Sequence, residues 1–146
     1  MKKLFVYHSY TGNGEIVASI MKENGFELRK VQEKKKMPKS FFWSMMVGGF
    51  QAGAQKKAKL KPFDQDISAY DEVVIGSPIW NANFTPALNA LLATLDFSTK
   101  KLSFVFYSGS GEGKKAVERL TKLFPNAPCI FLQEPKKYPE QLKKLD

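Results

Sequence analysis

Short hydrophobic runs recur along the chain, separated by stretches in which apolar residues repeat at helical spacing. The runs at Leu4–His8, Glu72–Ser77, Lys101–Tyr107 and Cys129–Leu132 predict buried strands, and the alternation over Phe26–Gln32 predicts a more exposed strand. Strands that alternate with helices form a mostly parallel sheet with both faces covered. The pattern therefore predicts a doubly wound α/β fold with five strands.

The helices between these strands have recognisable starts. Apolar residues repeat at helical spacing over Glu15–Lys22. Thr85 is placed to cap, and Pro86 to begin, a leucine-rich helix. Another helix is expected to end at Leu123, and the tail Pro139–Leu145 has room for little more than two helical turns.

Three unusual loops follow predicted strands, at Ser9–Gly14, Ser77–Phe84 and Ser108–Gly113, and the first of them is rich in hydroxyl, Gly and Asn residues. Ligands of such sheets bind outside the carboxyl ends of the strands. The first loop opens a helix, whose free N–H groups favour a phosphate, and it has no Lys or Arg, which suits a monoester held by hydrogen bonds. We expect Pro78 to turn the chain out of its strand, so that Trp80 presents a flat surface. The third loop is small enough for its backbone to approach a planar ligand.

One cysteine, Cys129, and one histidine, His8, limit the chemistry of this chain. They exclude an internal disulfide, a thiolate metal cluster and zinc sites built on several histidines. We expect His8 to be packed or hydrogen-bonded and Cys129 to be a buried apolar side chain. No side chain is expected to act as a catalytic nucleophile or base, so demanding chemistry requires a cofactor.

The net charge of +9 is concentrated in one segment of a chain whose 146 residues predict a single domain, 1–146. Residues 34–61 form a basic insertion with eight lysines and no acidic residue, which carries +8 of that charge. Its apolar middle, Phe41–Ala54, is expected to have helical character. Three interpretations remain open for it. The segment is a solvated face; or its aromatic residues close over a bound ligand or form a docking face for an acidic partner; or it contacts an anionic membrane. Because the cations are nearly all lysines and the excess positive charge lies in one segment, we do not expect nucleic acid as a partner.

The first residues contain only four apolar side chains in a row, Leu4 to Tyr7. This run is too short for a signal sequence or a membrane span. A cytoplasmic protein without stable membrane insertion is therefore the expectation.

Two motifs resemble the flavodoxin family. Ser9-Tyr10-Thr11-Gly12-Asn13 resembles its phosphate loop, S/T-x-T-G-x-T, and Tyr70–Trp80 resembles its third strand and flavin-contacting loop. The resemblance implies a flavodoxin-like sheet in the strand order 2-1-3-4-5 that binds FMN noncovalently. Gly14 stands where the pattern has its last Thr, which predicts one hydroxyl donor fewer.

The resemblance also implies which residues contact FMN and what the flavin does. Ser9, Tyr10, Thr11, Gly12, Asn13 and Gly14 would hold the phosphate; Ser77, Pro78, Ile79, Trp80 and Asn81 would line one side of the ring, and Ser108, Gly109, Ser110 and Gly111 the other. The implied function is electron transfer to a redox partner, and the lysine-rich segment favours a partner with an acidic face. We expect a monomer or a homodimer. Two alternatives remain: an NAD(P)H-dependent FMN reductase of quinones or other small acceptors, and a basic binding module without flavin.

Overall fold

A twisted, mainly parallel sheet forms the centre of the computed structural model, which describes residues 1–34, 57–80 and 82–146. Its strands are β1 (Lys3–Tyr7), β2 (Glu27–Lys30), β3 (Glu72–Trp80), β4 (Asn83–Phe84), β5 (Lys101–Ser108) and β6 (Cys129–Gln133). The parallel strands lie in the order β2-β1-β3-β5-β6, and β4 pairs antiparallel with the end of β3. With β4 set aside, this is the predicted order 2-1-3-4-5, so the flavodoxin-like α/β fold is confirmed.

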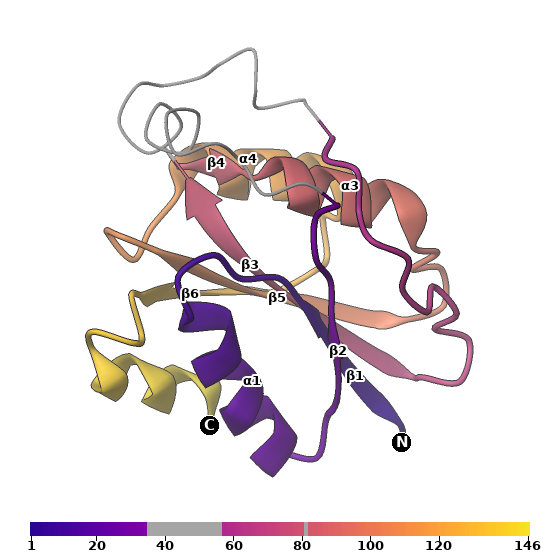
Figure 1. Cartoon of the computed structure of the whole chain (residues 1–146), viewed down its shortest axis with the longest axis horizontal. Helices are drawn as coiled ribbons and strands as arrows, with labels where there is room; N and C mark the ends of the chain where they lie inside the picture. The colour runs from indigo at the N-terminus through magenta and orange to yellow at the C-terminus, as the bar shows by residue number, and fades with distance from the viewer. Residues whose placement is uncertain (35–56, 81) are drawn as a thin grey trace.

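Helices cover both faces of the sheet (Figure 1). They are α1 (Asn13–Glu23), α3 (Pro86–Thr94), α4 (Lys114–Leu123) and the 3-10 helix η2 (Pro139–Leu145). The α1 and η2 helices lie on one face, whereas α3 and α4 lie on the other. Thr85 caps α3 as expected, because its hydroxyl oxygen accepts a hydrogen bond from the backbone N–H of Leu88 at 3.2 Å.

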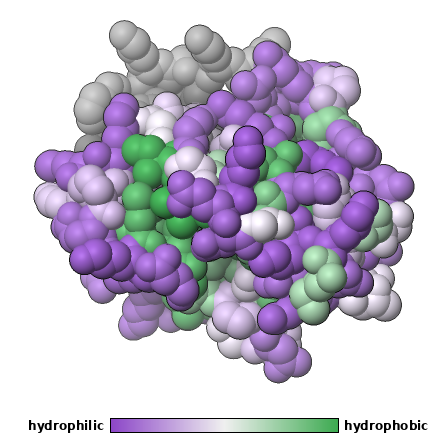
Figure 2. Space-filling view, turned by 90° about the horizontal axis from the view of Figure 1, so that it is seen from below, coloured by the Kyte–Doolittle hydropathy of each residue, from purple (hydrophilic) through white to green (hydrophobic). Residues whose placement is uncertain are grey.

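The sheet separates two hydrophobic clusters, which explains why its central strands are apolar on both faces. Beneath α3 and α4 the cluster includes Ile75, Leu88, Leu91, Phe104, Phe106 and Leu120. Beneath α1 and η2 it includes Phe5, Val17, Met21, Val105, Tyr107 and Leu132. Seen from below in Figure 2, the surface of the molecule is mostly hydrophilic, with a hydrophobic band in its left half.

The expectation that Pro78 ends its strand is wrong. β3 continues through Pro78, which is in register with Tyr107 of β5, and ends at Trp80. The strand then folds back, so that Ile79 pairs with Phe84 of β4. β1 pairs with β3 only as far as Gly76, so the N–H that Pro78 lacks is not needed for a ladder to β1.

Most of the basic insertion, residues 35–56, lies outside the described residues. The expected helix over Phe41–Ala54 and the three interpretations of this segment therefore stay predictions. Just after β2, residues 32–34 run antiparallel to residues 59–61. The N–H of Lys34 donates to the carbonyl of Lys59 at 2.8 Å, and the N–H of Lys61 donates to the carbonyl of Gln32 at 2.7 Å. Within the ranges that the structure describes, no helix is both long and apolar enough to cross a membrane.

Candidate functional site

The loop Ser9–Gly14 connects β1 to α1 and folds around one hydroxyl group. The Ser9 Oγ atom accepts hydrogen bonds from the backbone N–H of Gly12 at 3.2 Å and of Gly14 at 3.1 Å. Gly12 has a φ of 92°, which favours glycine. Ser9 thus braces the loop from inside. The backbone N–H groups of Thr11 and Asn13 have no acceptor among the described residues, and both remain available to a phosphate at the N-terminus of α1.

The structure gives a steric reason for Gly14, the position where the flavodoxin pattern has Thr. A Cβ atom at Gly14 would lie 2.6 Å from the Cβ of Ser9 and 2.8 Å from the hydroxyl oxygen of Tyr107. Tyr107 is fully buried, and its hydroxyl donates a hydrogen bond to the backbone carbonyl of His8. A hydroxyl group is therefore present beneath the loop, but it comes from the end of β5.

His8 lies under the first loop as a buried, neutral side chain. Its Nε2 atom is 2.9 Å from the Ser77 hydroxyl oxygen and 3.0 Å from that of Thr85. Burial lowers the pKa of His8 to about 3, so the imidazole is uncharged at neutral pH. The expectation of a hydrogen-bonded histidine is confirmed. Ser77 also donates to the carbonyl of Pro78 at 2.9 Å, so its hydroxyl serves the protein interior.

Trp80 packs against the first loop. Its ring centroid is 4.4 Å from that of Tyr10, at an interplanar angle of 40°, and Tyr10 meets His8 edge to face at 5.2 Å. Trp80 is only 6% exposed and pairs with Asn83 in the β3–β4 hairpin, whereas we expected it to present a flat surface. The Tyr10 hydroxyl bonds to the Glu33 carboxylate, whose pKa burial raises to about 6.

The loop Ser108–Gly113 combines an internal brace with open space. The Ser108 Oγ atom accepts from the N–H of Gly111 at 3.0 Å, and Gly111 has a φ of 78°. A Cβ atom at Gly109 would meet nothing within 4 Å. Gly109 and Ser110 are exposed, so this backbone is accessible from solvent, and its contact with a planar ligand stays a prediction.

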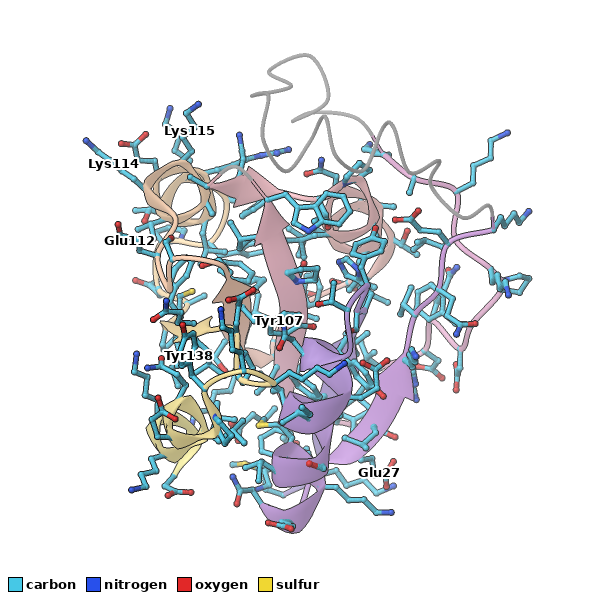
Figure 3. The ribbon with its side chains drawn as sticks, turned by 60° about the vertical axis from the view of Figure 1, so that its left-hand side comes forward. Glu27, Tyr107, Glu112, Lys114, Lys115 and Tyr138 are labelled. Atoms are coloured by element: carbon cyan, nitrogen blue, oxygen red, sulfur yellow. The ribbon has the colours of Figure 1, made fainter. Side chains whose placement is uncertain are left out.

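The segment that follows β6 joins the first and third loops, and sequence reasoning missed it. The N–H of Glu134 donates to the carbonyl of Ser108 at 3.0 Å. Two residues later, the N–H of Lys136 donates to the Asn13 side-chain oxygen at 2.9 Å. In Figure 3, Tyr107 lies near the start of α1, with Tyr138 of this segment and the start of α4 to its left. No local motif marks the segment, because only the fold brings it to this edge.

These observations define one site at the carboxyl edge of the sheet. The first loop, Trp80, the third loop and the segment after β6 meet there, whereas Ser77, Pro78 and Ile79 lie buried beneath them and Asn81 falls outside the described residues. A cavity of about 490 Å³ at the opposite edge, between the ends of α3 and α4, contains none of these residues. The free N–H groups at α1 suit a phosphate monoester, and the open backbone at Gly109 suits a flat ring. The fold is that of the flavodoxin-like FMN-binding class.

The sequence match narrows this class to a family. Residues 10–136 match the NADPH-dependent FMN reductase family, and the chain belongs to that family. No curated protein sequence matches the chain significantly. The match confirms FMN as the cofactor. It also corrects the resemblance stated above, which is right for the fold, whereas the family is not that of the flavodoxins proper.

Solved structures share the fold. A flavoprotein from Lactobacillus acidophilus NCFM, in complex with FMN, has a TM-score of 0.71 at 17% identity, with 96% of this chain and 97% of that chain covered. A presumed flavoprotein from Bacteroides eggerthii DSM 20697 has a TM-score of 0.76 at 20% identity, with 92% of each chain covered. The family match favours the reductase alternative over the electron carrier that we first expected, and it does not favour a module without flavin.

Proposed function

We propose that this protein is an FMN-dependent oxidoreductase that oxidises NAD(P)H and reduces a quinone or another small acceptor. The observation that carries the proposal is the family match over residues 10–136. Its two ends, in the first loop and at Lys136, are segments that meet at the candidate phosphate site. In the net reaction NAD(P)H, a proton and a quinone give NAD(P)⁺ and a hydroquinone.

The residues of the first loop hold the phosphate in this proposal. The backbone N–H groups of Thr11 and Asn13 donate to it, and the positive end of the α1 dipole favours its charge. Asn13 Nδ2 donates to the Thr11 hydroxyl oxygen at 3.2 Å, which leaves the Thr11 O–H free to donate. Ser9 keeps the loop in shape rather than binding the ligand itself.

The ring lies between the first and third loops. The exposed backbone of Gly109 and Ser110 borders it on one side, and the Tyr10–Trp80 pair borders it on the other. FMN held there would supply the chemistry, which is hydride transfer from the nicotinamide and electron transfer to the acceptor. The protein's part is to fix the ring, to exclude water with the two aromatic side chains and to leave one face open to both substrates.

Anaerobic mixing of the FMN-loaded protein with NADPH, and separately with NADH, tests the proposal. We expect the visible flavin absorbance to bleach within seconds and to return when a quinone is added. Flavin that dithionite reduces, but that neither nucleotide reduces, would overturn the proposal. That result would favour the electron carrier with an acidic redox partner.

A binding titration precedes this experiment. We expect added FMN to bind with its fluorescence quenched. Absence of binding at micromolar FMN would refute the reductase and the carrier together and would leave the basic binding module.

A further inference from the structure

Lys136 lies against the first loop, although it comes 123 positions after Asn13 in the chain. Its backbone N–H donates to the Asn13 side-chain oxygen at 2.9 Å, and its ammonium donates to the carbonyl oxygen of Thr11 at 3.4 Å. The Lys136 Nζ and Cδ atoms would each lie 3.5 Å from a Cβ atom at Gly12. The Lys136 side chain therefore lies over the backbone of the loop, with its ammonium group beside Thr11 and Gly12.

The segment around Lys136 is held firmly. The N–H of Glu134 donates to Ser108, and the carbonyl of Glu134 accepts from the N–H of Lys137 at 2.8 Å and of Tyr138 at 2.9 Å. Pro135 is buried between these contacts. The backbone of Lys136 is thus positioned by the fold, and little ordering is required when its side chain binds a ligand.

The charge of Lys136 is uncommitted. The ion pairs found in the described ranges are Arg29–Asp64 and Lys30–Glu15, the second at 2.6 Å, and neither involves Lys136. The bond from its ammonium to Thr11 is long and is made to a neutral oxygen. Lys136 is exposed, so its ammonium can turn from that carbonyl to an anion on the loop.

The loop itself lacks a balancing cation. Gly12 and Gly14 already give their N–H groups to Ser9, and Glu15 places an acid in the first turn of α1. Although burial raises the pKa of Glu15, hydrogen bonds from Lys30 and Ser9 hold it below its ordinary value, so Glu15 is ionised at neutral pH. A positive charge beside this helix end would add a charge-assisted hydrogen bond to what the helix dipole and the free N–H groups already offer a phosphate dianion.

We infer that Lys136 is the cation that binds the phosphate of FMN, and that it makes the site select FMN over riboflavin. This inference rests on the proposed FMN site. The first loop contains no Lys or Arg, so the fold supplies from the far end of the chain the charge that the loop lacks. The Lys136 ammonium exchanges the Thr11 carbonyl for a phosphate oxygen, and its backbone bond to Asn13 stays in place.

Fluorescence titrations of Lys136→Gln with FMN and with riboflavin test the inference. We expect the Kd for FMN to rise by about 5- to 20-fold, as for an exposed charge-assisted hydrogen bond, and the Kd for riboflavin to stay within about twofold. Lys136→Arg should restore most of the FMN affinity, because it keeps the charge. The FMN affinity of Lys136→Gln should also fall less steeply with added salt than that of the unaltered protein.

Lys137→Gln is the matched control. Lys137 is the exposed neighbour of Lys136, and its ammonium lies 5.5 Å from the ring centroid of Tyr138. We expect both of its Kd values to stay within about twofold of those of the unaltered protein. All variants should keep the unaltered thermal midpoint, since the backbone bond to Asn13 survives each substitution.

Three results would overturn the inference. Unchanged FMN affinity in Lys136→Gln would refute the role of Lys136 alone. Equal losses for FMN and riboflavin would mean that the side chain only shapes the loop. Failure of the unaltered protein to bind FMN would refute this inference together with the proposed function, whereas FMN that binds through Lys136 but is not reduced by NAD(P)H would refute the proposed function alone.

Discussion

The Tyr107 hydroxyl donates a hydrogen bond to the backbone carbonyl oxygen of His8, beneath the first loop of the site. Tyr107 comes from the end of β5 and His8 follows β1, so the bond ties together two strands that do not pair with each other. Desolvation raises the pKa of Tyr107 well above its ordinary value, so the phenol keeps its proton and remains a donor. The buried Tyr107 side chain thereby holds the backbone at His8 in place, where the chain passes from β1 into the first loop.

Tyr107→Phe should destabilise the protein and weaken FMN binding. The substitution leaves the His8 carbonyl buried without this donor, which costs about 1–3 kcal/mol. Urea denaturation gives the free energy of unfolding, and FMN titration gives the Kd. Tyr138→Phe serves as the control, because Tyr138 is only half-buried. Its free energy of unfolding should stay within about 0.5 kcal/mol of that of the unaltered protein. If Tyr107→Phe also lowered the free energy of unfolding by no more than about 0.5 kcal/mol, the hydrogen bond to His8 would not stabilise the protein as we infer.

Gly14→Ala should be destabilising although alanine favours helices. The added Cβ would lie 2.6 Å from the Cβ of Ser9 and 2.8 Å from the Tyr107 hydroxyl oxygen, so the loop must shift. We expect a loss of about 1–3 kcal/mol, typical of overpacking. Gly109→Ala is the matched control, because its Cβ would meet nothing within 4 Å. Equal unfolding free energies for the two variants in urea would argue against the steric requirement at Gly14.

His8 should make the protein less stable as the pH falls below about 6.5. Its pKa is about 3 in the folded protein and 6.5 ordinarily, so between these values the unfolded chain binds a proton that the folded protein excludes. The stability due to neutral His8 is complete above pH 6.5 and declines by up to about 1.4 kcal/mol per pH unit towards pH 3. Urea denaturation at a series of pH values measures this slope.

His8→Asn should show a shallower slope over the same range, because asparagine does not titrate. Glu33 acts in the opposite direction: burial raises its pKa to about 6, so between about pH 4.5 and 6 the folded protein binds the extra proton. The comparison is therefore made in a Glu33→Gln background. Identical slopes with and without His8 in that background would show that its burial does not control the acid response.

Thr85→Ala should cost about 1–2 kcal/mol of stability, at the upper end for a helix cap. The Thr85 hydroxyl oxygen accepts from the N–H of Leu88 at 3.2 Å and lies 3.0 Å from His8 Nε2, and the residue is fully buried. Both interactions need only the hydroxyl, so Thr85→Ser should recover most of the loss. Urea denaturation gives the free energy of unfolding, which should fall in the order unaltered protein, Thr85→Ser, Thr85→Ala. A serine variant as unstable as the alanine variant would assign the loss of stability to the methyl group.

Local patterns were enough to predict much of the fold and the first loop. The hydrophobic runs matched β1, β3, β5 and β6, since a buried parallel strand is apolar on both faces whatever its neighbours are. Thr85 and Pro86 marked the start of α3 because capping depends on residues within one turn. The same locality misled at Pro78, where pairing with β5 and the fold-back of β4 outweighed the tendency of proline to end a strand.

The sequence by itself determined the α/β class, the positions of the three loops and the absence of a cation from the first loop, because each depends on residues close together in the chain. Only the tertiary structure decided that Tyr107 lies under Gly14, that Trp80 turns inward onto Tyr10 and that Lys136 lies over the first loop. These contacts join residues 70 or more positions apart. Such pairs leave no periodic pattern in the chain, since their distance is set by the stacking of strands in the sheet.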